Sequence, residues 1–265
     1  MPMLDRPGCR IAYEVHGRGS AVLLTHGYAA SRRMWDKQID ALGRTHRLIL
    51  WDMRGHGESD SPEDPAAYSE AATAGDMAAL LDACGEERAI IGGLSLGGYM
   101  SLAFHLRYPE RVRAFLLFDT GPGYRNDEAR AAWNEYAESV ARGFEEKGFD
   151  ALRESPEVAA SRHRSVRGLI LAARGMLTQH DARVFESLVS IRVPTLVLVG
   201  AEDKPFLQAA DVMAARIPGA TKVVIEHAGH APNIDRPDAF NDNLLAFLAR
   251  LDGEAHTVSH GSVPE

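Results

Sequence analysis

A serine flanked by glycines, Gly93-Leu94-Ser95-Leu96-Gly97, is the first group of residues whose types and spacing suit chemistry. It follows an apolar run over 89–91 that is typical of a strand, and it precedes a helical pattern over 99–108. A serine on such a turn is strained and projects its hydroxyl outward, and the glycines leave room for the turn. The N–H of Leu96, at the helix start, has no partner within the helix. The motif therefore predicts a nucleophile, Ser95, beside one oxyanion donor.

A serine hydroxyl needs a base to act as a nucleophile, and the base needs a group that orients it. A strand pattern over Thr195–Val199 ends in an acidic loop, and we predict Asp203 in that loop as the orienting acid. Asp203 is preferred to Glu202 because Asp-Lys-Pro favours the turn from strand to helix. Asp119 directly follows another strand pattern and remains an alternative acid.

The base is predicted in the loop after a strand pattern over Lys222–Ile225, where two histidines occur. We prefer His230 to His227, because Gly229 leaves the backbone room and residue 230 lies farther beyond the strand. A carboxylate beside His230 would hold its imidazole in one tautomer and stabilise it once protonated. The two histidines lack the carboxylates or cysteines that would complete a metal site, so no metal is predicted.

The second oxyanion donor is expected after the strand pattern Val22–Thr25, where the chain reads His26-Gly27-Tyr28. Gly27 permits a tight turn, which would direct the N–H of Tyr28 toward the same point as that of Leu96. His26 is interpreted as a structural residue that ties this loop to its neighbours.

Strand and helix patterns alternate along most of the chain, which is typical of an α/β fold with a mostly parallel sheet and helices on both faces. The expected strands cover Ile11–Val15, Val22–Thr25, Leu48–Trp51, Ala89–Leu94, Phe115–Phe118, Thr195–Val199 and Lys222–Ile225. The expected helices lie around Trp35–Leu42, Ala74–Cys84, Gly98–Tyr108, Leu207–Ile217 and Phe240–Leu251.

The alternation stops between Gly121 and Leu188, where apolar residues follow helical spacing alone. We therefore predict a core over 1–121 and 189–252, an inserted helical cap over 122–188 and a flexible tail over 253–265. Trp133, Tyr136 and Phe144 would wall an apolar substrate pocket, or they would form the core of the cap itself.

The composition is that of a globular protein, with 45% hydrophobic residues and a net charge of −8. That charge, with no dense Lys/Arg stripe, argues against a nucleic-acid partner. No apolar run is long enough to span a membrane, and residues 1–10 lack the apolar core of a secretory signal. Cys9 and Cys84 make no disulfide framework, so we expect free thiols and a cytoplasmic location. The sequence leaves the oligomeric state open.

With these motifs in order, the chain resembles the α/β-hydrolase family from about Arg10 to Leu251. The motifs that carry the resemblance are residues 26–28, Asp52-Met53-Arg54-Gly55-His56-Gly57-Glu58-Ser59, residues 93–98, residues 200–203 and Gly229-His230. The resemblance is strongest to serine carboxylesterases and enol-lactonase-like enzymes. It implies Ser95 as nucleophile, Asp203 as acid, His230 as base, and the amides of Tyr28 and Leu96 as oxyanion hole. No cofactor is expected.

The function expected is hydrolysis of a small or medium, mainly uncharged ester or lactone through an acyl-enzyme. A triad-dependent lyase, a C–C bond hydrolase or a perhydrolase of the same fold is the alternative. For a lyase with a highly charged substrate, Arg125, Arg130, Arg162 and Arg164 would supply a basic pocket. The alternative without catalysis is a small-molecule receptor on the same fold.

Overall fold

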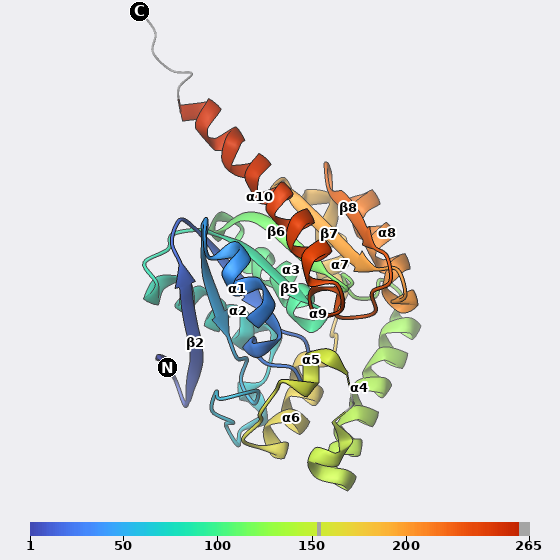
Figure 1. The fold of residues 1–265 in the computed structure, drawn as a ribbon. Coiled ribbons are helices and arrows are strands. Elements are labelled where there is room, and N and C mark those ends of the chain that lie inside the picture. Colours follow the sequence, from blue (N-terminus) through green and yellow to red (C-terminus); the bar gives the residue numbers. More distant parts are fainter. Residues whose placement is uncertain (153–154, 260–265) are drawn as a thin grey trace, which may run out of the picture.

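The computed structural model describes residues 1–152 and 155–259. Its centre is an eight-stranded sheet in the order β1-β2-β4-β3-β5-β6-β7-β8 (Figure 1). The strands are β1 (Met3–Arg6), β2 (Cys9–Gly17), β3 (Ser20–Thr25), β4 (His46–Trp51), β5 (Ala89–Leu94), β6 (Val112–Phe118), β7 (Thr195–Gly200) and β8 (Thr221–Ile225). β2 pairs antiparallel with β1 and β4, and every other pair is parallel. The fold class predicted from the sequence, α/β with a mostly parallel sheet, is confirmed.

Helices cover both faces of this sheet. They are α1 (Asp36–Leu42), α2 (Glu70–Ala83), α3 (Leu96–Arg107), α4 (Asp127–Lys147), α5 (Pro156–Ala159), α6 (Val166–Ala172), α7 (Arg183–Ser187), α8 (Lys204–Arg216), α9 (Pro232–Asp235) and α10 (Pro237–Ser259). Apolar residues of α1 and α10 pack on one face, and those of α2, α3 and α8 pack on the other. Successive strand residues alternate between the two cores: Leu23 belongs to one, and Val22 and Leu24 to the other. This two-sided burial explains why the strands are apolar almost throughout.

The elements that differ from the sequence prediction include β1, α9 and α10. β1 was not expected, because a four-residue strand with an exposed position carries little periodic signal. α10 continues to Ser259, beyond the predicted end at Leu251. Its buried stripe, which includes Phe240 and Leu244, establishes the helix, and adding residues to an existing helix is far easier than starting one. Part of the predicted tail, residues 260–265, lies outside the described residues.

Helices α4 to α7 lie between β6 and β7, within the range 122–188 that was predicted as a cap, and this segment is called the insertion below. Within the described parts of that range, 122–152 and 155–188, the structure contains helices and turns and no strand. α4 packs on α6, and the pair lies beyond one end of the sheet (Figure 1). The insertion therefore stands where a ligand-binding edge of an α/β sheet would be covered.

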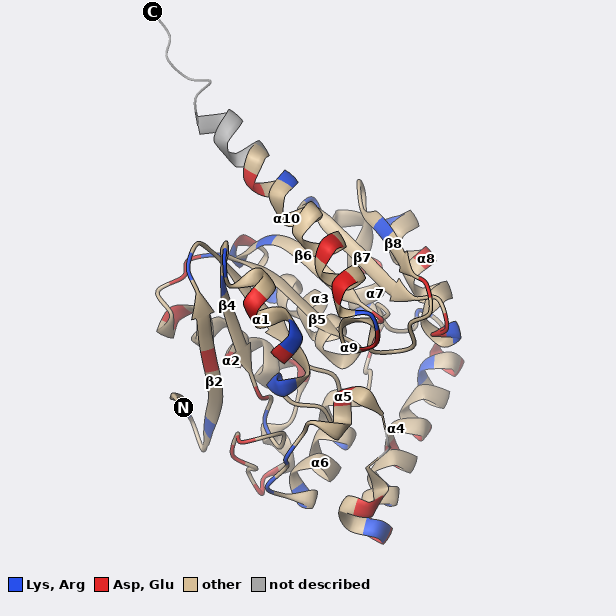
Figure 2. Cartoon of the chain, in the orientation of Figure 1, with Lys and Arg blue, Asp and Glu red and all other residues tan. Residues whose placement is uncertain are grey.

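Basic and acidic residues are interspersed along the helices and loops in Figure 2, with no band of a single sign in that view. Among the described residues, no helix combines the length and the apolar character needed to cross a membrane.

Candidate active site

Ser95 lies on the turn between β5 and α3, with φ 56° and ψ −117°. Residues other than glycine rarely adopt a positive φ, so the backbone at Ser95 is held in a strained conformation. The packing around it explains the flanking glycines: a Cβ at Gly93 would lie 2.5 Å from the Thr25 carbonyl oxygen, and one at Gly97 would lie 2.2 Å from it. The motif thus places β5, the serine turn and α3 in direct contact with the end of β3.

The neighbouring strand fixes the same turn. The Ser95 N–H donates to the Phe118 carbonyl at 3.0 Å. The Thr120 hydroxyl donates to the Ser95 carbonyl at 2.6 Å, and a Cβ at Gly98 would collide with the Thr120 side chain at 2.5 Å. Thr120, which the sequence analysis did not single out, therefore anchors the serine backbone to the loop that also carries Asp119.

The loop after β3 lies against the serine. A Cβ at Gly27 would be 3.5 Å from Ser95 Cβ, so the backbone of Gly27 and Tyr28 passes beside the candidate nucleophile. Leu96 is the first residue of α3, and its N–H belongs to the group of helix-start donors that have no partner within the helix. Both predicted oxyanion donors are thus on segments adjacent to Ser95.

His26 is fully buried and bonded through both ring nitrogens. Nδ1–H donates to the Gly27 carbonyl at 2.6 Å, and Nε2 accepts from the Met53 N–H at 2.9 Å. This arrangement requires a neutral imidazole, and burial lowers its pKa from 6.5 to about 4. The bonds tie the loop after β3 to the loop after β4, as expected for a structural histidine.

A second histidine in a similar role comes from the insertion and was missed by the sequence analysis. His163 Nε2–H donates to the Ala29 carbonyl at 2.9 Å, and its Nδ1 accepts from the Gly57 N–H at 3.0 Å. Ala29 has φ 57°, an unusual conformation for alanine. The Tyr28 hydroxyl also donates to the Leu169 carbonyl at 2.9 Å. Hydrogen bonds to the insertion therefore hold the loop that bears the predicted oxyanion donor.

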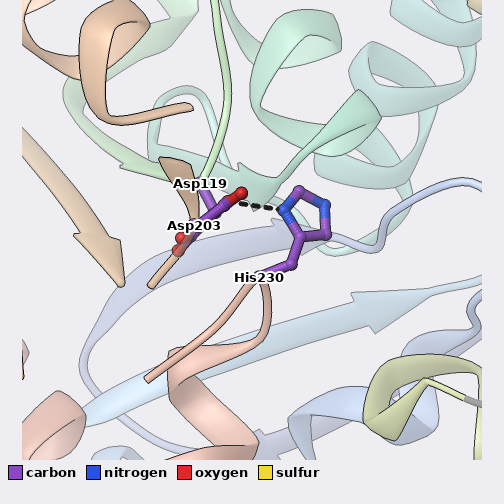
Figure 3. Close-up of side chains that lie close together, drawn as sticks. All are labelled: Asp119, Asp203 and His230. Carbon is purple, nitrogen blue, oxygen red and sulfur yellow. Dashed lines mark hydrogen bonds and ion pairs between the residues drawn. The ribbon is translucent and has the colours of Figure 1, made fainter. Parts of the chain in front are cut away.

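The structure pairs the predicted acid and base. His230 Nδ1 lies 2.7 Å from Asp203 Oδ2, with Asp203 only 7% exposed (Figure 3). Because an ionised carboxylate only accepts, Nδ1 carries the proton and Nε2 is left free to act as a base. The alternatives Glu202 and His227 are both exposed.

The two loops that carry this pair are packed backbone to backbone. A Cβ at Gly200 would lie 2.1 Å from the Gly229 carbonyl oxygen, and the Glu202 N–H donates to the Ala228 carbonyl at 2.9 Å. Asp235 Oδ2 accepts from the Gly229 N–H at 2.9 Å. These contacts hold the acid loop and the base loop as one unit.

Asp119, the alternative acid, lies next to this pair. It is buried, and its Oδ1 accepts from the Gly200 N–H at 2.8 Å. One carboxylate oxygen of Asp119, one of Asp203 and one ring nitrogen of His230 lie within 4.8 Å of one another (Figure 3). Burial, together with the Asp203 carboxylate, raises the pKa of Asp119 well above its usual value. A metal there would compete with the existing bond between His230 and Asp203.

A cavity of about 500 Å³ opens beside Ser95. Its wall is mainly apolar and comes from the loop after β6, the start of α4 and α8; Arg125 is the one charged residue among the described residues that line it. Phe206 joins the cavity to the acid–base pair, since it lines the wall and its ring lies 5.0 Å from that of His230.

Of the three predicted pocket aromatics, only Trp133 lines this cavity. Phe144 is buried elsewhere, with its ring edge-on to Tyr28 at 6.3 Å. Tyr136 is 40% exposed and packs on Trp133. The prediction that Tyr136 and Phe144 wall this cavity is therefore corrected: helix α4 turns only part of its apolar stripe toward the cavity and uses the rest to pack the insertion.

Known proteins resemble this chain in sequence and fold. The profile of the alpha/beta hydrolase family matches residues 22–243. The 3-oxoadipate enol-lactonase 2 of Acinetobacter baylyi is 27% identical over 88% of this chain and 90% of its own length. A thermophilic esterase from Thermogutta terrifontis superposes with a TM-score of 0.79 at 31% identity, covering 94% of this chain and 97% of that one. The enol-lactonase of Burkholderia xenovorans has a TM-score of 0.76 at 25% identity, with 94% and 100% covered. The chain belongs to the alpha/beta hydrolase family.

Proposed function

We propose that this hydrolase cleaves a carboxylic ester or lactone of small or medium size, with Ser95 as nucleophile. The observation that carries the proposal is the bond between Asp203 and His230, on the loops after β7 and β8, at the edge of the sheet where the strained serine turn also follows a parallel strand. Esterases and enol-lactonases among the similar proteins support the same substrate class.

In the proposed reaction, His230 Nε2 takes the proton from the Ser95 hydroxyl as the oxygen attacks the substrate carbonyl. The resulting oxyanion accepts hydrogen bonds from the N–H groups of Tyr28 and Leu96, each worth about 2.7–4 kcal/mol in the transition state. His230 then protonates the leaving alcohol, and water repeats the steps on the acyl-enzyme. Asp203 stabilises the imidazolium throughout.

The cavity favours an uncharged group over a multiply charged one. Of the four arginines that a lyase pocket would use, only Arg125 lines the cavity. Arg130 instead donates to the Tyr124 carbonyl and pairs with Asp127. We therefore expect Arg125→Gln to leave the hydrolysis of uncharged esters unchanged.

Replacement of Ser95 tests the proposal. Ser95→Ala should lower kcat for p-nitrophenyl butyrate on the order of 10⁴-fold or more, because the nucleophile is lost while the cavity is kept. Ser139→Ala, an exposed serine on α4, is the matched control and should be fully active. Substantial turnover by Ser95→Ala would reject the assignment. Acylation of Ser95 without turnover would indicate a ligand receptor instead.

A further inference from the structure

Asp119 is a buried carboxyl group that the proposed reaction does not use. It directly follows β6, with φ 40°, and the Gly200 N–H donates to its Oδ1. The other oxygen, Oδ2, is buried and makes no hydrogen bond with a conventional donor among the described residues. Buried polar atoms in proteins nearly always have a hydrogen-bond partner, so the surroundings of this oxygen need an explanation.

The groups around Asp119 disfavour a negative charge on it. Asp203 accepts a hydrogen bond from His230 Nδ1–H, which favours its ionised form, and it lies beside Asp119 (Figure 3). Asp235 adds a further negative charge. The hydrogen bond from the Gly200 N–H acts in the opposite direction and favours the ionised form of Asp119. Two carboxylates that share a site cannot both ionise readily, and burial adds to the cost of the second charge.

We propose that Asp119 carries a proton at Oδ2 and donates it to the Asp203 carboxylate, so that it is a positioning residue for the acid of the triad. A neutral carboxyl can donate where an ionised one can only accept. The hydrogen bond satisfies Oδ2 and leaves Asp203 ionised, with its rotation fixed so that Oδ2 of Asp203 faces His230. Asp119 keeps its proton through the whole reaction. This inference rests on the proposed function, since it assigns Asp203 and His230 their roles.

Two substitutions separate a neutral donor from a charged acid. In Asp119→Asn, the amide oxygen can accept from the Gly200 N–H while the NH₂ group donates to Asp203, with no charge. We expect kcat within about threefold of the unmodified enzyme, since the donor is retained. In Asp119→Leu, of similar size, the donor is lost; kcat should fall about 10–100-fold with little change in KM, as is typical when a residue that orients a functional side chain is removed.

The outcome with asparagine is decisive. If Asp119→Asn loses as much activity as Asp119→Leu, a charge at residue 119 is used and the inference is overturned. Full activity of Asp119→Leu overturns it as well. Infrared spectroscopy provides a measurement that does not depend on the stability of the leucine variant: a protonated-carboxyl band at neutral pH should be present in the enzyme and absent from Asp119→Asn. A spectrum without that band contradicts the proposal.

Failure of the function and failure of this inference give different results. Ser95→Ala and Asp203→Asn both lose activity if the proposed triad is correct, whatever Asp119 does. If they lose activity and Asp119→Asn does too, only the role of Asp119 is wrong.

Discussion

His163 of the insertion donates its Nε2–H to the carbonyl of Ala29, at 2.9 Å, and thereby holds a residue of positive φ next to the predicted oxyanion donor. The bond crosses from residue 163 to the core of the protein. The position of the Tyr28 N–H therefore depends on a side chain of the insertion.

Removing that side chain should impair turnover more than binding. In His163→Ala the carbonyl of Ala29 loses its donor, and a displacement of about 1 Å in a catalytic group can cost about 100-fold in rate. We expect kcat to fall about tenfold or more with little change in KM. Arg162→Ala, at the exposed neighbouring residue, should retain full activity. Steady-state kinetics with p-nitrophenyl butyrate checks this, and a kcat equal in both variants would contradict it.

The volume of the cavity should be reduced by Ala209→Phe. Ala209 lines the cavity on α8, and its Cβ would lie 3.2 Å from a Cβ at Gly121, which also lines the cavity. The larger side chain should lower kcat/KM for long-chain p-nitrophenyl esters and leave short ones nearly unaffected. The control is Ala215→Phe, at an exposed position on the same helix. A uniform loss along the ester series would show that the cavity does not bind the chain.

The buried ion pair between Asp52 and Arg32 should contribute to the free energy of unfolding. Asp52 is buried, pairs with Arg32, and accepts from the backbone N–H groups of Arg32 at 2.7 Å and Glu58 at 2.9 Å. Asp52→Ala leaves those two N–H groups without their acceptor and removes one of the three carboxylates that pair with Arg32 among the described residues, the others being Glu14 and Glu58. It should lower the free energy of unfolding by about 3–5 kcal/mol.

Urea unfolding measures this loss. Asp82→Ala is a suitable comparison, because Asp82 pairs with Arg111 from a side chain that is 68% exposed. That substitution should cost only about 0–1 kcal/mol. Equal losses in the two variants would show that burial of the pair is irrelevant.

The depressed pKa of His26 predicts a pH-dependent stability. Below pH 6.5 the unfolded chain protonates this imidazole, whereas the folded protein does so only near pH 4. Stability is therefore lost as the pH falls through this range, by about 1.4 kcal/mol per pH unit for one proton.

Comparison with His26→Gln isolates that proton, because the other buried groups titrate in both proteins. Between about pH 6 and pH 5, the free energy of unfolding of the unmodified protein should fall by about 1.4 kcal/mol relative to that of the variant. Parallel pH dependences of the two proteins would disprove the assignment.

The sheet and the candidate triad could be predicted because they depend on local patterns. Apolar runs mark the strands, and Ser95, Asp203 and His230 each follow the end of a parallel strand, where chain order alone brings loops together. The choice of His230 over His227 followed from the room that Gly229 provides.

The contacts of the insertion could not be predicted in the same way. His163 binds a backbone carbonyl and a backbone N–H, and such partners leave no trace in the residue types of Ala29 or Gly57. The helical spacing of Tyr136 and Phe144 indicates a shared face but not the segment that the face meets. That segment depends on tertiary packing, as does the neutral state proposed for Asp119.

The close backbone contact between Gly200 and Gly229 has a consequence for protein engineering. A chimaera that takes only the acid loop from a relative would place a loop shaped for the relative's base loop against Gly229 of this protein. Transplanting both loops in one step preserves their mutual fit. Recombination between homologues should therefore place its crossover points outside residues 200–229.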